Sequence, residues 1–169
     1  YITHSNTIFQ AKELSTIMKL TFEKDAILNG LNIVSKAIPS KTTMSILECI
    51  LVDASAGEIK FTANDTEMGI ETKVTGMILE KGKIALEAKL FYEIVRKLST
   101  EDAAITIESD ERFNTTISCG SSVFNIPGRD GEEFSYLPYI ERDHSISLSQ
   151  FTLKEAIRQT IFSISVNDS

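Results

Sequence analysis

Alternation of apolar and polar residues dominates the chain, and helical spacing interrupts it in three places. Residues 18–23 alternate, which predicts a strand. Apolar residues then recur at helical spacing, which predicts a helix capped by Asp25 and ending near Lys36. Its apolar side contains Ile27, Leu28, Leu31 and Val34. Gly30 either weakens this helix by about 1 kcal/mol relative to Ala or marks a close backbone contact.

Two further helices are expected, and strands fill most of the remaining chain. Residues 89–98 predict the second helix, with Leu90, Ile94, Val95 and Leu98 on its apolar side and Phe91 at the border. The third follows an alternating stretch at 144–149 and begins after a Ser149 cap. The other predicted strands are 46–55, 58–64, 67–74, 82–88, 104–109, 113–119 and 122–128. This order predicts an α+β fold with antiparallel sheets.

The pattern also divides the chain into segments. Residues 1–17 read as an upstream extension or a cloning remnant, because Met18 opens the first strand. Residues 147–169 repeat the opening strand-and-helix pattern, which indicates the truncated start of a second, similar domain.

The stretch TANDTEMGIETKV, residues 62–74, concentrates carboxylates and raises the question of a catalytic or metal site. A hairpin with Asp65-Thr66 at its tip would pair Lys60 with Glu71 and Glu58 with Lys73. Apolar pairs such as Ala63 with Met68 would then share the other face. This register is the favoured interpretation, although a slightly longer turn is compatible with the sequence.

In that hairpin the carboxylates are separated, and Asp65 is expected to accept bonds from nearby backbone N–H groups. The competing interpretation is a metal-dependent hydrolase that uses Asp65, Glu67 and Asp110. No motif supports an enzyme: there is no phosphate-binding loop, no dinucleotide fingerprint and no nucleophile elbow. His4 and His144 are isolated in the sequence. We therefore expect no catalytic residue, no metal and no cofactor.

Composition is that of an ordinary globular protein: of 169 residues, 42% are hydrophobic and 24% are charged. No apolar run approaches the length of a membrane span, and the start lacks the features of a signal peptide. We therefore expect a cytoplasmic protein with no membrane partner. Cys49 and Cys119 stand far apart and are expected to be reduced, partly buried thiols.

The net charge of −7 argues against nucleic-acid binding, but a sum can hide a basic surface. Lysines and arginines fall on or beside the predicted helices, whereas carboxylates fall mostly in strands and turns. If both helices of the domain cover one face of the sheet, that face is basic and the opposite side is acidic. Charge alone leaves a DNA-binding face and an ordinary solvated helix surface both open.

Several segments in order resemble the bacterial DNA polymerase III beta subunit, the sliding-clamp family. They are MKLTFEKDAILNGLNIVSKAI, SILECILVDASAGEIKFTANDTEMGIETKV, ALEAKLFYEIVRKL and SYLP. TANDTEMGI is similar to a hairpin motif of that family, and the resemblance runs from Met18 to the end of the chain.

The resemblance implies an α+β clamp domain over 18–138, with two helices on one face of antiparallel sheets. A linker at 139–146 and the truncated start of a second clamp domain at 147–169 would follow it. In the family, two subunits of three similar domains close head to tail into a ring around duplex DNA. The helices line the hole and the sheets form the outside. It therefore implies a non-catalytic processivity factor of the replicative polymerase, with duplex DNA, a second clamp subunit, the polymerase and the clamp loader as partners. The alternative is an α+β protein-interaction module without DNA binding.

Carried over by position, the DNA-facing residues are Lys41, Lys89, Arg96, Lys36, Asn29 and Asn32. The subunit contact would use the strand SSVFNIPG, with Phe124 and Ile126 at the apolar positions and Val123 and Ser121 beside them. The later domains, which carry the partner surface and the peptide pocket, are expected to be missing. This stretch alone is therefore expected neither to encircle DNA nor to bind those peptides well. We expect the apolar side of the third helix to dock elsewhere, to pair with another copy or to be disordered.

Overall fold

The computed structural model describes residues 16–99, 104–134 and 146–163. The chain divides into two compact units, residues 1–137 and 138–169. Most of the predicted extension and linker lies outside the described residues. The first described strand begins at Thr16, two residues upstream of the predicted domain boundary.

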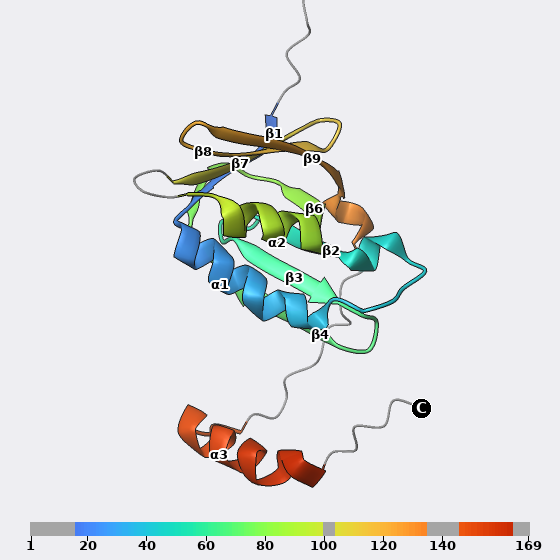
Figure 1. Cartoon of the computed structure of the whole chain (residues 1–169), viewed down its shortest axis with the longest axis vertical. Helices are drawn as coiled ribbons and strands as arrows, with labels where there is room; N and C mark the ends of the chain where they lie inside the picture. Colours follow the sequence, from blue (N-terminus) through green and yellow to red (C-terminus); the bar gives the residue numbers. More distant parts are fainter. Residues whose placement is uncertain (1–15, 100–103, 135–145, 164–169) are drawn as a thin grey trace, which may run out of the picture. The chain divides into compact units, whose positions relative to one another are not determined.

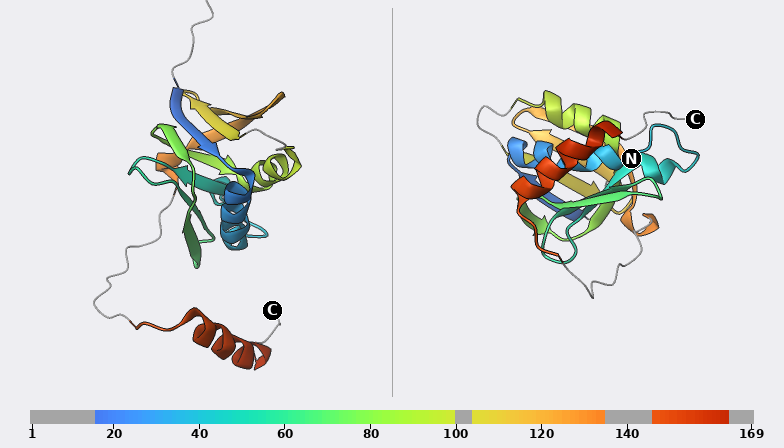
Figure 2. Two further views of the ribbon diagram at one scale, coloured as in Figure 1. Left: turned by 90° about the vertical axis from the view of Figure 1, so that its left-hand side faces the viewer. Right: turned by 90° about the horizontal axis from the view of Figure 1, so that it is seen from below.

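The first unit is an α+β domain with nine antiparallel strands and two α-helices (Figure 1). In chain order, its elements are β1 (Thr16–Phe22), α1 (Lys24–Val34), η1 (Ser35–Ala37), η2 (Ser45–Glu48), β2 (Cys49–Asp53), β3 (Lys60–Asn64), β4 (Gly69–Lys73), β5 (Met77–Glu80), β6 (Lys83–Glu87), α2 (Ala88–Lys97), β7 (Ile105–Asp110), β8 (Asn114–Cys119), β9 (Ser122–Asp130) and η3 (Gly131–Glu133). Both α-helices cover the same side of the strands, as predicted (Figure 2).

The sheet curls until its two ends approach each other. Its strand order is β4-β3-β2-β6-β9-β8-β7-β1-β5, so β4 and β5 lie at opposite ends of the order. Only residues 74–76 separate these two strands in the chain, which forces the ends together. Gly76 fits at this junction because a Cβ there would lie 2.7 Å from Phe22 and 2.9 Å from Ile59. Strand β5 is not among the predicted strands, because its four residues give little alternation.

The domain is built from two similar halves that interlock. A strand, an α-helix and a set of antiparallel strands form the first half, from β1 to β5, and the same order recurs from β6 to β9. The first strand of each half pairs with the second strand of the other: β1 with β7, and β6 with β2. The long β9 pairs with β8 and then with β6, whereas its counterpart in the first half is divided into β4 and β5.

Three phenylalanine rings occupy the centre of the core. The ring of Phe61 on β3 lies 6.0 Å from that of Phe22 on β1 and 6.1 Å from that of Phe91 on α2. All three are buried. Offset and edge-on aromatic pairs at these separations add roughly 0.5–1.5 kcal/mol each to the burial of apolar surface. The cluster therefore ties the helix layer to the sheet.

Helix α1 packs directly on β3 and β4 through its predicted apolar face. Its N-cap is Glu23, whose side chain makes no capping bond, so the prediction of Asp25 as the cap is wrong. Asp25 lies in the first turn instead, where a carboxylate interacts favourably with the helix dipole. The interpretation of Gly30 as a close backbone contact is confirmed: a Cβ there would lie 2.5 Å from Val74 and 3.2 Å from Phe61.

The 62–74 hairpin forms, with its register shifted by two residues from the prediction. Ala63 pairs with Ile70 rather than with Met68, because the turn spans four residues. Asp65 accepts hydrogen bonds from the backbone N–H groups of Glu67 at 3.0 Å and Met68 at 2.7 Å. A two-residue shift preserves the faces of both strands, so the predicted ion pairs still form, diagonally across the ladder.

Those ion pairs join Lys60 to Glu71 at 3.0 Å and Lys73 to Glu58 at 2.8 Å.

Strand β2 is shorter than the predicted strand 46–55, because residues 45–48 form a 3-10 helix before it. Strand β2 itself is almost continuously buried, because Ile50 and Val52 face the main core while Cys49 and Leu51 face a second cluster with Phe134.

The second unit contains α3 (Gln150–Thr160) and η4 (Ile161–Ser163). The predicted cap is confirmed: Ser149 Oγ accepts a hydrogen bond from the Thr152 N–H at 3.0 Å. Residues 146–149 do not form the predicted strand; within the described part of this unit there is no strand with which they could pair. The apolar side chains Phe151, Leu153, Ile157 and Ile161 are exposed.

Replacing Gly30 by Ala should destabilise the domain despite the higher helix propensity of Ala. Overpacking costs roughly 1–3 kcal/mol, and an approach of 2.5 Å to Val74 favours more than the minimum cost. After subtraction of the propensity gain of about 1 kcal/mol, urea denaturation should show a free energy of unfolding lower than that of the parent chain by up to about 2 kcal/mol. Asn29→Ala, at an exposed position of the same helix, is the control and should not destabilise. A Gly30→Ala chain more stable than the parent would contradict this packing.

Replacing Asp65 by Ala should destabilise the hairpin at neutral pH and much less in acid. Hydrogen bonds from the Met68 and Glu67 N–H groups lower the pKa of Asp65 in the folded chain. Its carboxylate therefore stabilises the fold above the ordinary pKa of Asp, and this contribution is lost as the pH falls through the lowered pKa. Urea denaturation at about pH 7 and about pH 3 measures the difference. An equal loss at both pH values, or an equal effect of Glu67→Ala, would contradict this role.

Candidate functional site

Helices α1 and α2 lie antiparallel and side by side. The Tyr92 hydroxyl donates a hydrogen bond to the Asn32 side chain at 2.9 Å, and the Lys24 ammonium donates to the Leu98 carbonyl oxygen. These contacts join the end of α1 to the middle of α2, and the start of α1 to the end of α2. Lys36 and Lys89 are therefore brought to the same end of the helix pair, and Arg96 lies toward the other end.

All six residues predicted to face DNA are exposed: Asn29, Asn32, Lys36, Lys41, Lys89 and Arg96. Within the described ranges, Lys36, Lys41 and Lys89 have no carboxylate partner, so these cations are available to a ligand. Asn32 is occupied by Tyr92 and Arg96 by a neighbouring carboxylate. Five of the six thus fall into two groups, three cations without a carboxylate partner and two side chains bonded within the helix layer, and the sixth, Asn29, is an exposed amide.

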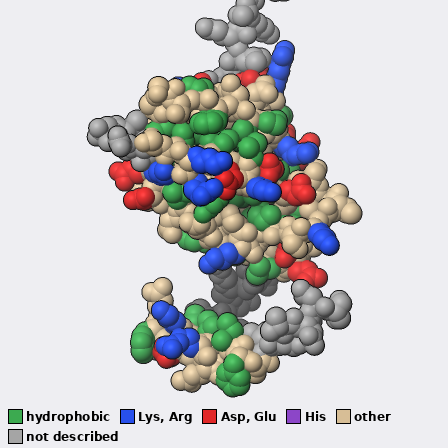
Figure 3. Space-filling view, viewed as in Figure 1, with side chains coloured by type: hydrophobic (Ala, Val, Ile, Leu, Met, Phe, Trp, Pro, Cys, Tyr) green, Lys and Arg blue, Asp and Glu red, His purple; other side chains and the backbone are tan. Residues whose placement is uncertain are grey.

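Charge is divided between the helix side and the strands. The helix segments 23–41 and 88–97 together carry six basic residues (Lys and Arg) and three acidic residues (Asp and Glu). The rest of the described part of the first unit carries seven basic and fourteen acidic residues. Lysine and arginine side chains gather over the helices, interspersed with a few carboxylates (Figure 3). A chain of net charge −7 therefore still presents a basic helix side.

Glu93 is the one carboxylate of helix α2. Its carboxylate lies 2.7 Å from the Arg96 guanidinium and 3.5 Å from the Lys97 ammonium. The hydrogen bond from Arg96 holds the pKa of Glu93 below its usual value. The i,i+4 spacing of Glu93 and Lys97 is typical of a helical ion pair, whereas the shorter contact with Arg96 has i,i+3 spacing.

The strand predicted as the subunit contact has one free edge. Residues 122–127 pair with β8 on one side, and β6 joins β9 only from Gly128 onward. Val123 is 59% exposed and Phe124 is 40% exposed, so both can meet a partner. Ile126 is only 5% exposed and belongs to the core, and Ser121 lies in the turn before the strand. Of the four predicted residues, Val123 and Phe124 thus present the apolar surface.

Helix α2 adds a second wall to this edge, which the sequence did not reveal. A hollow of about 320 Å³ is lined by Leu90, Glu93, Ile94, Lys97, Phe124, Asn125 and Ile126. Leu90, predicted to be buried, is 38% exposed here, and Phe91, predicted at the border, is fully buried. The helical period allowed either residue to face the core, and only packing against the sheet decides between them.

Comparison of the two halves shows that the two helices meet their neighbouring strands through side chains of different size. When the N-caps Glu23 and Glu87 are matched, Gly30 of α1 corresponds to Ile94 of α2, and Ala26 corresponds to Leu90. The small residues let α1 settle on β4. The larger pair keeps α2 away from β9, which leaves apolar space between them.

The carboxylates of the alternative hydrolase interpretation are not brought together. Asp65 accepts bonds within its own turn, and Asp110 accepts bonds from the Arg112 and Asn114 N–H groups in another. Among the described residues, no group of three or more His, Cys, Asp or Glu could hold a metal ion.

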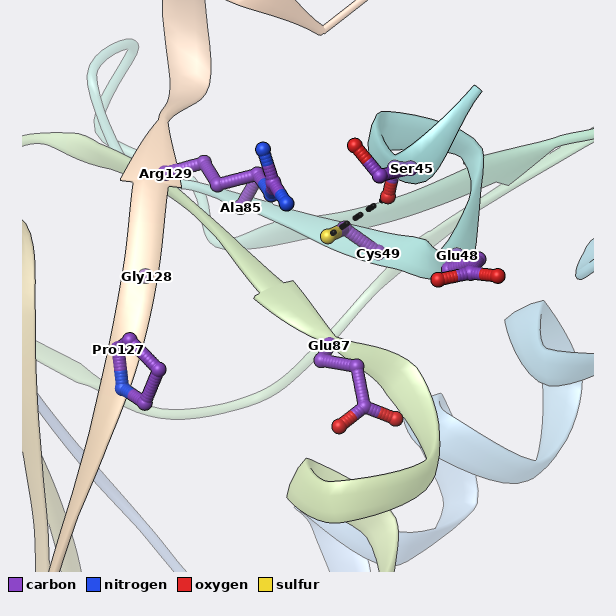
Figure 4. A pocket seen from close by; sticks show the side chains of 8 residues that line it. All are labelled: Ser45, Glu48, Cys49, Ala85, Glu87, Pro127, Gly128 and Arg129. Carbon is purple, nitrogen blue, oxygen red and sulfur yellow. Dashed lines mark hydrogen bonds between the residues drawn. The ribbon is translucent and has the colours of Figure 1, made fainter. Parts of the chain in front are cut away.

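A polar hollow of about 360 Å³ contains Cys49, Glu48, Glu87 and Arg129 (Figure 4). The Cys49 thiol contacts the Ser45 carbonyl oxygen at 3.7 Å. Burial raises the pKa of this thiol, and the nearby Arg129 only partly opposes the shift. Since the thiolate is the nucleophilic form, this hollow does not favour covalent catalysis.

Across the residues that the structure describes, no helix has the length and apolar character of a membrane span.

Comparison with known proteins agrees with this geometry. The family model described as DNA polymerase III beta subunit, N-terminal domain, matches residues 18–138. The Beta sliding clamp of Halalkalibacterium halodurans is 37% identical over 160 residues, and that of Bacillus subtilis is 36% identical. Each match covers 90% of this chain and 42% of the relative, so the chain spans less than half the length of these proteins.

Solved structures give the same result. A structure from Eubacterium rectale, assigned as a DNA polymerase III beta subunit, has a TM-score of 0.82 and 62% identity, covering 90% of this chain and 41% of that one. The DNA polymerase sliding clamp from Bacillus subtilis has a TM-score of 0.82 and 35% identity, covering 90% and 42%. The match over residues 18–138 and the shared fold show that the chain belongs to the DNA polymerase III beta subunit family.

Proposed function

We propose that this chain supplies the first domain of a DNA sliding clamp, the processivity factor of a replicative DNA polymerase. The observation that carries the proposal is the pair of antiparallel helices with exposed lysines on a domain whose strands are acidic. Lys36, Lys41, Lys89 and Arg96 would approach the DNA backbone, and Asn29 and Asn32 would lie between them. The domain has no catalytic role in this proposal, and its setting is the cytoplasm.

The mechanism requires no reaction. Two clamp subunits form a ring around duplex DNA, and topology rather than affinity keeps the ring on its template. Lysine and arginine contacts to phosphates are independent of sequence, so the energy changes little as the ring moves along the duplex. Weak contacts therefore favour sliding, and the acidic outer strands disfavour binding of DNA to the wrong side of the ring.

The free edge of β9 would contact the second clamp subunit. An unpaired strand edge can extend a sheet across an interface through backbone hydrogen bonds. Phe124 and Val123 supply apolar surface, and the hollow beside α2 accepts an apolar side chain from the partner. The polymerase and the clamp loader are further partners in this proposal and would bind elsewhere on the complete clamp.

Replacing Lys36 or Lys89 by Ala should weaken binding to a short duplex at low ionic strength. Each phosphate contact removed should lower the slope of log affinity against log salt by about one. Fluorescence anisotropy with labelled duplexes of two unrelated sequences measures both the affinity and its dependence on salt concentration. Lys73→Ala, on the outer hairpin, is the matched control and should bind like the parent chain. Equal losses of affinity at Lys36, Lys89 and Lys73 would contradict a DNA-binding helix side and favour a protein-interaction module. Binding that resists high salt would contradict it as well.

In the absence of the later domains, the free β9 edge can pair with the same edge of a second copy of this chain, and replacing Phe124 by Asp should reduce this concentration-dependent self-association. The charge would place an unpaired carboxylate against the apolar edge, where burial is costly. Sedimentation velocity over a concentration series gives the readout. Met77→Asp changes another exposed apolar residue, on β5, and should leave association unchanged. If only Ile157→Asp on α3 reduced association, the β9 edge would not be the contact.

A further inference from the structure

Glu93 is placed where it can oppose DNA binding by α2. It lies one helical turn from Arg96 and Lys97 and contacts both cations, at 2.7 Å and 3.5 Å. The corresponding positions of α1 carry Asn29 and Asn32 in place of Glu93 and Arg96. At these matched positions, α2 therefore carries an exposed ion pair between Arg96 and Glu93, whereas α1 carries two uncharged amides.

We propose that Glu93 is an intramolecular competitor for DNA phosphates at Arg96, which keeps the grip of α2 on the duplex weak. The inference rests on the proposed function and deepens it by naming the residue that limits affinity. A phosphate and the Glu93 carboxylate require the same guanidinium donors. When DNA approaches, the phosphate must either displace Glu93 or tolerate its negative charge nearby.

The exchange is inexpensive, which suits a ring that must move. The side chains of Arg96 and Glu93 are 54% and 38% exposed, so water solvates either one when the pair opens. Exposed ion pairs of this kind are only marginally stable. Arg96 can therefore pass between Glu93 and successive phosphates as DNA passes the helix, and the return to Glu93 prevents long residence on any one phosphate.

Glu93→Gln removes the competing charge while preserving the size of the side chain. Its affinity for a short duplex at low ionic strength should rise about two- to five-fold, the range expected for one exposed charge pair. The matched control is Glu71→Gln, which makes the same change of net charge. Glu71 also belongs to an exposed ion pair, with Lys60 at 3.0 Å, but lies on the strand side of the domain. Its affinity for DNA should stay near that of the parent chain.

A double-variant cycle assigns the gain to Arg96. In a chain that already carries Arg96→Ala, Glu93→Gln should give less than half of the gain seen with Arg96 present, because the competition has been removed. Circular dichroism and urea denaturation of each variant establish that the compared chains are equally folded.

The outcomes separate this inference from the proposed function. If Lys36→Ala weakens binding and Glu93→Gln strengthens it, both are supported. If Lys36→Ala weakens binding while Glu93→Gln has no effect, or no more effect than Glu71→Gln, the competitor role is overturned and the helix-side site remains. If the parent chain shows no binding at low ionic strength, both are overturned.

Discussion

The short connection between β4 and β5 constrains the whole domain. Three residues, Val74 to Gly76, join strands at opposite ends of a nine-stranded order. The sheet must therefore curl, and its concave interior is filled by the cluster of Phe22, Phe61 and Phe91. Both helices cover the same side of this curled sheet. The joint presentation of their lysines and arginines is a consequence of how the sheet closes.

Two interlocked halves with different helix-facing residues give the domain two different edges. At α1, Gly30 permits a contact so close that Val74 and Phe61 leave no room for a Cβ. At α2, Leu90 and Ile94 hold the helix off β9 and create the hollow beside Phe124. Helix α1 thus packs directly on β4, whereas a hollow separates α2 from the exposed part of β9. The matched positions differ in side-chain volume, Gly30 with Ile94 and Ala26 with Leu90.

The sequence allowed the element types, the buried face of α1 and the ion pairs of the hairpin to be predicted, because these depend on local periodicity and charge. It did not allow the hairpin register, since a shift of two residues preserves both faces and only the turn around Asp65 distinguishes the alternatives. It also missed β5, whose four residues are strand only because β1 lies beside them.

The candidate site was predicted less completely than the fold. Lys41 and Lys89 were assigned through the family resemblance and Lys36 by its helical face, and all three are free of carboxylate partners within the described ranges. The hollow between α2 and the β9 edge depends on the distance between a helix and a strand that are far apart in the sequence. No local pattern of residues encodes that distance. The same holds for the burial of Ile126 between neighbours from other elements.

In the proposed function, DNA meets the helix side of this domain through weak contacts to its phosphates. Amide chemical-shift mapping by nuclear magnetic resonance, during titration with a short duplex at low ionic strength, tests this contact residue by residue. We expect fast-exchange shifts confined to α1, α2 and the loop containing Lys41, and we expect them to disappear when salt is added. Shifts centred on β3 and β4, or spread evenly over the domain, would contradict this contact.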